Sequence, residues 1–341
     1  MKVVLDVYGG DYSPEEMIKG AADALSQNPR LELVLVGDEA AIKSGLSALK
    51  YDQKRLSVVD AKEVISNDDV PTQAIKQKKN SSLVKALEYL KNNDDAAALV
   101  SAGSTGAVLT GAFMLLGRIK GISRPALAPV LPTVKGGGVV LCDCGANVDC
   151  KALNLLHFAL MGAAFSTAML GIEKPRVGLL SNGAEDKKGN ELTHEAFALL
   201  KTAPLNFLGN CEARDLLSGD FDVVVADGFD GNIALKSAEG VAGAIFAMLK
   251  AGIKNGGVRA KIGAGLLLPT LKGLKKKMDY TENGGACFLG VNKVVVKSHG
   301  ASKAKSITAS IEQANRLAEA GVVEKIKAAL LKIAPQENAE D

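Results

Sequence analysis

The sequence has 341 residues, enough for one large α/β domain or two smaller ones around a buried core. Hydrophobic residues make up 47% of the chain, aromatic residues only 4%, and the net charge is +3. This composition excludes a dedicated nucleic-acid-binding protein, which would carry basic patches and base-stacking aromatic side chains. The start, MKVVLDVYGGD, lacks the anatomy of a signal peptide because Asp6 interrupts its apolar run, so we expect a cytoplasmic protein.

No uninterrupted apolar segment reaches the roughly 20 residues that cross a bilayer. The nearest, from Phe158 to Ile172, contains polar residues and is typical of a core helix. The five cysteines are an odd number at irregular spacing, which argues against a disulfide framework. The spacing of Cys142, Cys144 and Cys150 suits zinc poorly, because no histidine is close. We therefore expect buried thiols, and neither a metal nor a cofactor.

Short β-branched runs alternate with helical patterns along the chain. The expected strands are 3–7, 32–36, 97–100, 138–142, 177–181 and 222–226. The expected helices are 13–26, 81–91, 105–118, 152–170 and 190–201. Strands separated in this way imply right-handed crossovers and a mostly parallel sheet that helices cover on both faces, which gives three layers.

Two further strands, 285–290 and 292–297, are close enough in sequence to form an antiparallel hairpin attached to the sheet. No internal repeat or low-complexity linker divides the chain. The predicted organisation is therefore a single α/β catalytic domain over 1–341, with a helical hairpin inserted at 238–280.

The proposed insertion has two helical segments joined by Asn255, Gly256 and Gly257, a sequence typical of a turn. Apolar residues beside a basic cluster suit the surface of an anionic membrane. A hairpin that packs on a partner subunit, with its lysines solvated, is an open alternative. The residues considered for membrane or carrier contact are Arg259, Lys261, Leu266, Leu267, Leu268, Lys272, Lys275, Lys276 and Lys277.

Several junctions between a strand and the following helix are rich in Gly and small polar residues. They are 6–11 (DVYGGD), 101–106 (SAGSTG), 182–190 (NGAEDKKGN) and 227–232 (DGFDGN), and a further Gly-rich turn at 144–151 opens the central apolar helix. Free backbone N–H groups and the helix dipole favour anions at such junctions. We therefore expect these turns to converge on one sheet edge and to form an anion site.

The identity of the anion depends on motifs. Neither a dinucleotide fingerprint after the first strand nor a P-loop is present, which disfavours an NAD-dependent dehydrogenase. The sequence AGSTG is one residue from the nucleophile elbow of hydrolases, and Ser104, Asp227 and His299 follow a hydrolase triad's chain order. We favour the alternative that Ser104 and Thr105 cap a helix or bind an anion, because Ala102 stands where the elbow needs Gly.

The three histidines have different expected roles. His157 lies in an apolar helix and is expected to be a packed, hydrogen-bonded core residue, whereas His194 is expected to be exposed. His299 lies in a loop where it can transfer a proton or stabilise an oxyanion, or can simply fix the turn.

Six segments together resemble the acyl-acyl-carrier-protein:phosphate acyltransferases of bacterial phospholipid synthesis. In chain order they are LDVYGGDYSPEEMIKGA, VSAGSTGAVLTGA, CDCGANVDCKALNLLHFALMG, VGLLSNGAEDKKGNELT, NFLGNCEARDLLSGDFDVVVADGFDGNIALKSAEG and FLGVNKVVVKSHGAS. The resemblance extends from Leu5 to about Ala314. This chain departs from the family pattern at Ser104, where Asn is usual, and at His157, where Gln is usual.

The resemblance implies a fold related to phosphate acetyltransferases and isocitrate dehydrogenases, and a homodimer. It implies transfer of a long-chain acyl group from the thioester of acyl carrier protein to inorganic phosphate, giving acyl phosphate and free carrier. It also implies that the hairpin at 238–280 serves dimer and membrane contact, at the inner face of the membrane. Because the carrier is acidic, a basic docking patch is expected, and the hairpin's basic residues are candidates for it as well.

Phosphate is already a nucleophile near neutral pH, so the protein must position it, stabilise an oxyanion and help the thiolate leave. Lys188 is the first candidate for phosphate or oxyanion contact, with Asn190 donating beside it at a helix start. His299 is the candidate for helping the thiolate leave. In this view Glu185 and Asp186 point to solvent.

Further donors and loop-orienting carboxylates complete the predicted site. The second-rank donors are Asn232, Ser104, Thr105, Gly103 and Gly106. Asp6, Asp11 and Asp227 are expected to orient loops through Asx-type bonds rather than to act as bases, because a carboxylate repels phosphate. Two rival functions stay open: a short-chain phosphate acyltransferase that uses coenzyme A, and an inactive membrane-associated scaffold that only binds the carrier.

Overall fold

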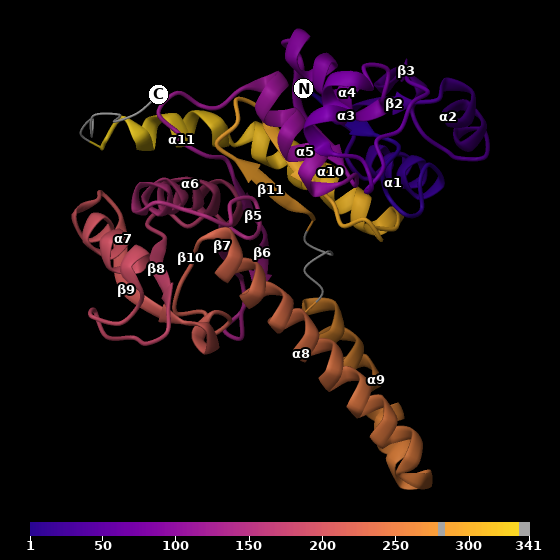
Figure 1. The fold of residues 1–341 in the computed structure, drawn as a ribbon. Helices are drawn as coiled ribbons and strands as arrows, with labels where there is room; N and C mark the ends of the chain where they lie inside the picture. The colour runs from indigo at the N-terminus through magenta and orange to yellow at the C-terminus, as the bar shows by residue number, and fades with distance from the viewer. Residues whose placement is uncertain (279–283, 334–341) are drawn as a thin grey trace.

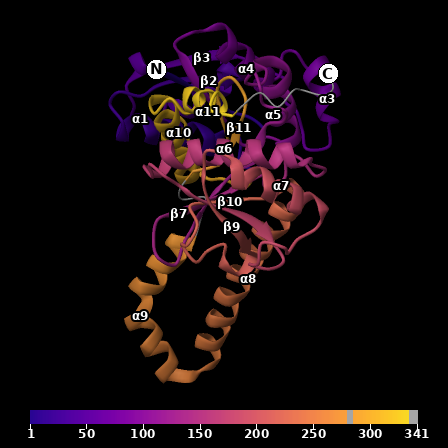
Figure 2. The same ribbon diagram turned by 90° about the vertical axis from the view of Figure 1, so that its left-hand side faces the viewer.

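The computed structural model describes residues 1–278 and 284–333, whose strands form two sheets. The seven-stranded sheet has the order β3-β2-β1-β4-β12-β11-β5, and the five-stranded sheet has the order β6-β7-β10-β8-β9. Figure 1 and Figure 2 show the helix α6 (Ala152–Leu170) between the two sheets, and a long helical hairpin that extends away from both.

The seven-stranded sheet is parallel through its centre. It consists of β1 (Lys2–Asp6), β2 (Glu32–Gly37), β3 (Leu56–Asp60), β4 (Ala96–Ser101), β5 (Ala126–Ala128), β11 (Ala286–Leu289) and β12 (Val294–Lys297). The strand β11 pairs antiparallel with β12 and with β5, and β12 pairs parallel with β4. The predicted hairpin attached to the sheet is therefore confirmed. The central strands are apolar between their end residues, as at Val3–Leu5 in β1, because helices cover both faces.

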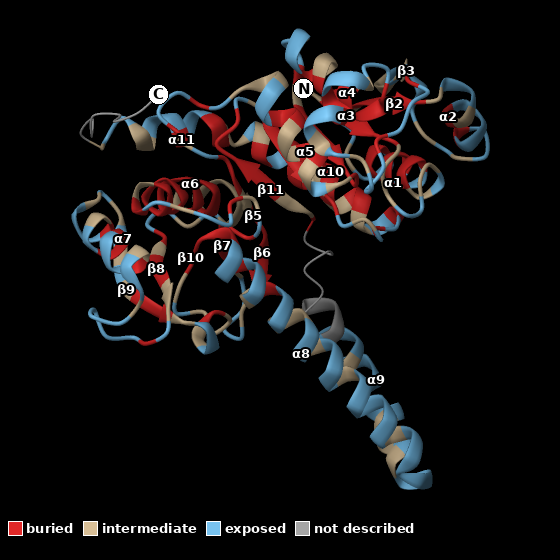
Figure 3. Cartoon of the chain, in the orientation of Figure 1, coloured by how far each residue is buried: buried red, intermediate tan, exposed pale blue. Residues whose placement is uncertain are grey.

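The helices on the two faces of this sheet are amphipathic. They are α1 (Glu15–Gln27), α2 (Glu39–Leu46), α3 (Pro71–Gln77), α4 (Ser82–Asn92), α5 (Thr105–Gly111), α10 (Ala304–Glu319) and α11 (Val322–Leu330). The helices α1 and α10 pack together on one face, while α4 and α5 contribute to the core on the other. Figure 3 shows these helices buried on the side that faces the sheet and exposed on the other.

The five-stranded sheet is parallel apart from one edge strand, β6, which pairs antiparallel with β7. Its strands are β6 (Val130–Pro132), β7 (Gly138–Cys142), β8 (Arg176–Ser181), β9 (Asn206–Glu212) and β10 (Val223–Val225). The helix α6 packs on this sheet, as does α7 (Glu191–Thr202). Because α6 is apolar on all sides, it also packs against α10 and α11 and so joins the two sheets in one core.

The projecting hairpin consists of α8 (Gly228–Asn255) and α9 (Gly257–Met278). The turn falls at the predicted Asn-Gly-Gly sequence. However, α8 is one continuous helix that begins at Gly228, ten residues before the predicted start of the insertion at position 238. Tyr280, the predicted end of the insertion, lies outside the described residues. Figure 3 shows exposed residues along most of the hairpin.

Within the described part of the chain, α6 and α8 are long and apolar enough to cross a membrane by length and composition alone. Of the most apolar window of α6, 67% is buried, so this is the core helix that the sequence indicates. Only 6% of the corresponding window of α8 is buried. The sequence analysis does not single out α8 in this respect, because three lysines, a glutamate and glycines interrupt its apolar run.

Candidate active site around the start of α8

The glycine-rich turns follow strands of both sheets. Turns 6–11 and 101–106 follow β1 and β4 of the seven-stranded sheet, while 144–151, 182–190 and 227–232 follow β7, β8 and β10 of the five-stranded sheet. The expectation that all of them share one sheet edge was therefore wrong. Turns 101–106, 144–151, 182–190 and 227–232 instead contribute to two cavities beside the first turns of α8, whereas no residue of turn 6–11 lines either cavity.

The first cavity, the inter-sheet cleft, has a volume of about 330 Å³ and takes residues from both sheets. Thr105 and His299 come from the seven-stranded sheet, and Gly145 and Asn232 from turns of the five-stranded sheet. The predicted residues Thr105, Asn232 and His299 thus meet in one cavity. Main-chain groups at Gly145 come close to Asn232, because a Cβ built there would lie 3.7 Å from Cγ of that asparagine.

The cleft also contains Lys297, which the sequence analysis misses. Its Nζ donates to the carbonyl oxygen of Ala102 at 3.4 Å and to that of Ser298. Burial lowers the pKa of this lysine to about 8, although Asp11 and Asp6 act in the opposite direction. A lysine at the carboxyl end of a buried strand, two residues before His299, is the signal that could have pointed to it.

Asp6 is a buried loop-orienting carboxylate, as predicted. Its Oδ2 accepts from the Ser101 hydroxyl at 2.7 Å, and its Oδ1 accepts from the Tyr8 N–H at 3.2 Å. Burial raises its pKa to about 6, against these hydrogen bonds and the nearby Lys297. The Gly103 N–H donates to Oγ of Ser101 at 3.1 Å. The Gly103 N–H is thus bonded within its own turn, and its role as an anion donor stays a prediction.

The turn after β4 does not form a hydrolase triad. Ser104 stands at the N-cap of α5, as predicted, but its side chain makes no capping bond, so of its two predicted roles anion binding stays a prediction. Asp227 caps α8 instead, accepting from the N–H groups of Phe229 at 2.9 Å and Asp230 at 2.8 Å. Nδ1 of His299 accepts from the Ala301 N–H at 3.2 Å. Because these bonds use Asp227 and His299 separately, the two residues orient their own turns.

The remaining members of this group lie at the rim. Asp11 is exposed, and its N–H donates to the carbonyl of Gly300 at 2.8 Å, which holds the turn after β1 against the turn that carries His299. Gly106 lies in the first turn of α5, where a Cβ would meet Cγ of Pro71 at 3.0 Å.

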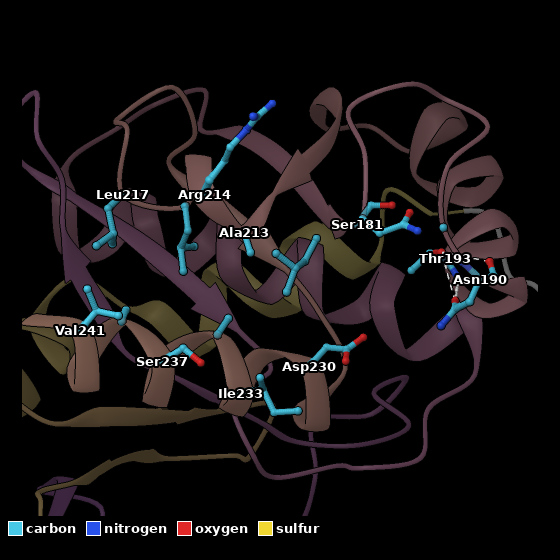
Figure 4. Close-up of a pocket in the computed structure, with 16 residues that line it drawn as sticks. Ser181, Asn190, Thr193, Ala213, Arg214, Leu217, Asp230, Ile233, Ser237 and Val241 are labelled. Atoms are coloured by element: carbon cyan, nitrogen blue, oxygen red, sulfur yellow. Dashed lines mark hydrogen bonds between the residues drawn. The ribbon is translucent and has the colours of Figure 1, made fainter.

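The second cavity, the α8 pocket, has a volume of about 690 Å³ and lies on the other side of α8. Asp230, Ile233 and Ala234 line it, whereas Asn232, Leu235 and Lys236 line the cleft. Positions one and two apart on a helix point in different directions, so one helix serves both cavities. Asn190 lines the α8 pocket, and Figure 4 shows it near Ser181 and Thr193.

The loop 182–190 carries the two residues that rank first in the sequence analysis. Asn190 caps α7, because its Oδ1 accepts from the Thr193 N–H at 2.9 Å; its Nδ2 has no partner among the described residues. Lys188 is exposed, and its Nζ makes no hydrogen bond or ion pair within 1–278 and 284–333. Glu185 and Asp186 are exposed as predicted, and Asp186 pairs with Lys201 at 3.4 Å.

The structure therefore separates the predicted residues, with Asn190 on one side of the start of α8 and Thr105, Asn232 and His299 on the other. Lys188 lines neither cavity. The residues considered for membrane or carrier contact are on α9, and none of those described lines either cavity. The exposed ones are Arg259, Lys261, Leu266, Leu267, Leu268 and Lys272. The side chains of Lys275, Lys276 and Lys277 lie outside the described part of the chain.

The other two histidines are as expected. His157 is buried and its Nδ1 lies 3.1 Å from Oγ of Ser123, and burial lowers its pKa to about 4. His194 is exposed. The cysteines are free thiols, and burial raises the pKa of Cys144 to about 12. No group of three His, Cys, Asp or Glu in the described residues is arranged to hold a metal ion.

The comparison with known proteins supplies the family. The model of the family described as "Fatty acid synthesis protein" matches residues 1–325. A phosphate acyltransferase of Caldanaerobacter subterraneus subsp. tengcongensis is 49% identical over 327 residues, which cover 96% of this chain and 96% of that protein. One of Clostridium novyi is 47% identical over 327 residues, covering 96% and 98%.

This chain belongs to the phosphate acyltransferase family. The resemblance given by the sequence motifs is therefore confirmed, and the protein is an acyltransferase. The EutD phosphotransacetylase of Staphylococcus aureus has a TM-score of 0.62 at 18% identity, covering 94% of each chain. A phosphotransacetylase of Streptococcus pyogenes has a TM-score of 0.61 at 18% identity, covering 95% of this chain and 94% of that one. These structures confirm the predicted α/β fold of the acyltransferase.

Proposed function

We propose that the enzyme transfers a long-chain fatty acyl group from the thioester of acyl carrier protein to inorganic phosphate. The product is an acyl phosphate for phospholipid synthesis. The observation that carries this proposal is the pair of cavities at the start of α8, one cationic and one largely apolar. The cleft suits phosphate because Lys236, Lys297 and the amide of Asn232 line it.

The chemistry needs positioned donors rather than a protein nucleophile. Phosphate attacks the thioester carbonyl, a tetrahedral oxyanion forms, and the carrier thiolate leaves. Lys188 is assigned to the oxyanion or phosphate because its ammonium group has no partner in the described residues and lies on the loop that leads into α7. Asn190 can donate from its free Nδ2, and Nε2–H of His299 can donate a hydrogen bond that stabilises the leaving thiolate.

The hairpin is assigned to partner contacts. Exposed leucines and basic residues share α9, where Leu266 is 79% exposed. Isolated apolar residues are ordinary on a protein surface, but a long exposed helix that carries many of them marks an interaction site. We assign it to homodimer contact and to an anionic membrane, with the acidic carrier docking on the basic residues nearby. The enzyme is then cytoplasmic and peripherally associated with the inner face of the membrane.

A short-chain acyltransferase that uses coenzyme A is the second candidate, because the phosphotransacetylases share the fold. The two are separated by measuring thiol release from palmitoyl-acyl carrier protein and from acetyl-coenzyme A, each with and without phosphate. The proposal predicts phosphate-dependent release from the palmitoyl carrier at a kcat/KM at least about 100-fold higher than from acetyl-coenzyme A. A higher kcat/KM for acetyl-coenzyme A than for the palmitoyl carrier would instead support the short-chain acyltransferase.

The scaffold alternative is tested by the same measurement, since a scaffold binds the carrier without phosphate-dependent turnover. The names of the relatives favour an enzyme over this alternative.

A further inference from the structure

We propose that the α8 pocket holds the alkyl tail of the acyl donor, with the thioester carbonyl at the end of the pocket near Asn190. This inference rests on the proposed function, because it names the part of the protein that recognises the long chain. It assigns the apolar tail to the α8 pocket, and phosphate that enters from the cleft must then reach the carbonyl around the first turns of α8, because the attacking oxygen has to come within about 3–3.5 Å of the carbonyl carbon.

The pocket has two chemically different ends. Figure 4 shows Leu217 and Val241 toward one end, and Ser181, Asn190 and Thr193 toward the other, with Ile233 beside Asp230 between them. Its volume of about 690 Å³ falls within the ~300–1,000 Å³ usual for small-molecule sites. An apolar chamber with a few polar groups at one end suits an amphiphile whose polar group is at one terminus, as in a fatty acyl thioester.

The polar end has unsatisfied hydrogen-bonding groups. Oγ of Ser181 is buried without a hydrogen-bond partner among the described residues. Nδ2 of Asn190 also lacks one, since the capping bond to Thr193 uses only Oδ1. Buried polar groups in native proteins are nearly always paired, so an unpaired hydroxyl in a pocket wall calls for a ligand. A thioester carbonyl can accept from both groups after rotation of the serine hydroxyl.

The apolar end continues beyond the pocket along α8. Ile233, Val241, Ile245 and Met248 are 50%, 60%, 53% and 66% exposed. Their helical spacing places them on one face of α8, the face that lines the pocket. A chain longer than the pocket therefore meets a continuous apolar track rather than water.

The charged groups near the pocket leave the apolar end neutral. Arg214 is at the rim, and its guanidinium pairs with Glu212 at 2.6 Å and Asp215 at 3.9 Å. Asp230 also lines the pocket, and its carboxylate would repel an anionic head group. A neutral thioester is thus a better occupant of the polar end than a free fatty acid.

The test measures binding apart from turnover. The probes are unreactive S-alkyl thioethers of N-acetylcysteamine with butyl, octyl and dodecyl chains, titrated calorimetrically into the full-length protein. We expect each added methylene to tighten binding about threefold until the pocket is filled. Ala234→Trp fills the pocket and should weaken dodecyl binding at least about tenfold while changing butyl binding less than about twofold.

Matched variants keep the result interpretable. Ala247→Trp makes the same change at an exposed position on another face of α8, and should leave the chain-length dependence intact. If Ala234→Trp does not fold, Val241→Ser serves in its place, because Val241 is exposed and its loss should weaken dodecyl binding about threefold.

Two results would overturn the inference. One is binding by the unaltered protein that is independent of chain length. The other is a loss of binding affinity on Ala234→Trp that is equal for all chain lengths. A loss of affinity that accompanies dissociation of a dimer in light scattering would also overturn it, because the pocket would then be an interface between two copies. If binding depends on chain length but no phosphate-dependent turnover is found, the assignment of the pocket stands and the proposed function is wrong.

Discussion

The hydroxyl of Ser101 donates to Oδ2 of Asp6 at 2.7 Å, joining the turn after β1 to the turn after β4. The same hydroxyl accepts from the Gly103 N–H at 3.1 Å, so one buried serine fixes both turns. Lys297 lies on β12 beside β4, and its charge lowers the pKa of Asp6 against the larger effect of burial. The buried hydrogen bonds of Ser101 thus hold the turns beside Lys297, which lines the cleft.

The pKa of Asp6 predicts a pH dependence of folding. Its folded-state pKa of about 6 lies above its ordinary value of 3.8, so the folded protein binds this proton more tightly than the unfolded chain. The corresponding stability is fully present below pH 3.8 and is lost as the pH rises through about 6. Asp6→Asn removes this titration.

We expect the stability difference between the unaltered protein and Asp6→Asn to change by about 3 kcal/mol across that window. Urea unfolding at a series of pH values measures it. A difference that stays constant with pH would show that Asp6 titrates normally in the folded protein.

Gly9 is a position where the backbone requires glycine. Its φ is +109°, and a Cβ there would lie 2.7 Å from Cα of Gly103. Gly9→Ala should therefore lower the free energy of unfolding by about 1–3 kcal/mol. Gly240→Ala is the control, since Gly240 lies within α8 with nothing within 4 Å of the added carbon, and should raise the helix stability by about 0.5–1 kcal/mol. Equal effects of the two substitutions would contradict the close packing of the two turns.

Lys297 should control phosphate affinity. Removing its charge by Lys297→Met should raise the KM for phosphate about 10-fold to 100-fold, the range of a lost charge-assisted hydrogen bond. Because burial lowers its pKa to about 8, phosphate affinity of the unaltered enzyme should fall as the pH rises through that value. The fall should be absent in the variant.

Lys293→Met is the matched control for this experiment. Its Nζ donates to the carbonyl of Ala96 at 2.8 Å, at the other end of β4 from the cleft, so the same charge is removed away from the site. A similar rise in KM in both variants would show a general effect of net charge rather than a phosphate contact.

Lys188→Ala tests the loop before α7. Loss of one donor to the oxyanion costs about 3 kcal/mol, so kcat should fall about 100-fold. Lys187→Ala removes the neighbouring exposed lysine and should leave kcat within about twofold. Circular dichroism and thermal unfolding should be unchanged in both, since neither side chain is buried. Similar kcat values for Lys188→Ala and Lys187→Ala would show that Lys188 does not take part in the reaction.

Local sequence patterns located the strands whose apolar runs are continuous. The runs at β1, β4, β7 and β8 were predicted because parallel strands covered on both faces are apolar throughout. The strand β9, NFLGNCE, was missed, since its polar residues and Gly209 lower its β propensity, and its pairing with β8 shifts register.

Local sequence patterns do not show which strands that are distant in sequence pair with one another. The division into two sheets depends on contacts such as β12 with β4, which pairs Val295 with Leu99. The glycine-rich turns were correctly identified as strand ends, but only this pairing places Lys297 beside the turn after β4. Asn190 was predicted as a donor from its place at a helix start, and the capping bond to Thr193 shows that only half of its amide is free.

The most direct measurement of the central claim is the formation of acyl phosphate from palmitoyl-acyl carrier protein, trapped with hydroxylamine as palmitoyl hydroxamate. We expect hydroxamate that depends on added phosphate, appears with release of the carrier thiol, and falls about 100-fold with Lys188→Ala. An intact thioester in the presence of phosphate and folded protein would contradict the account.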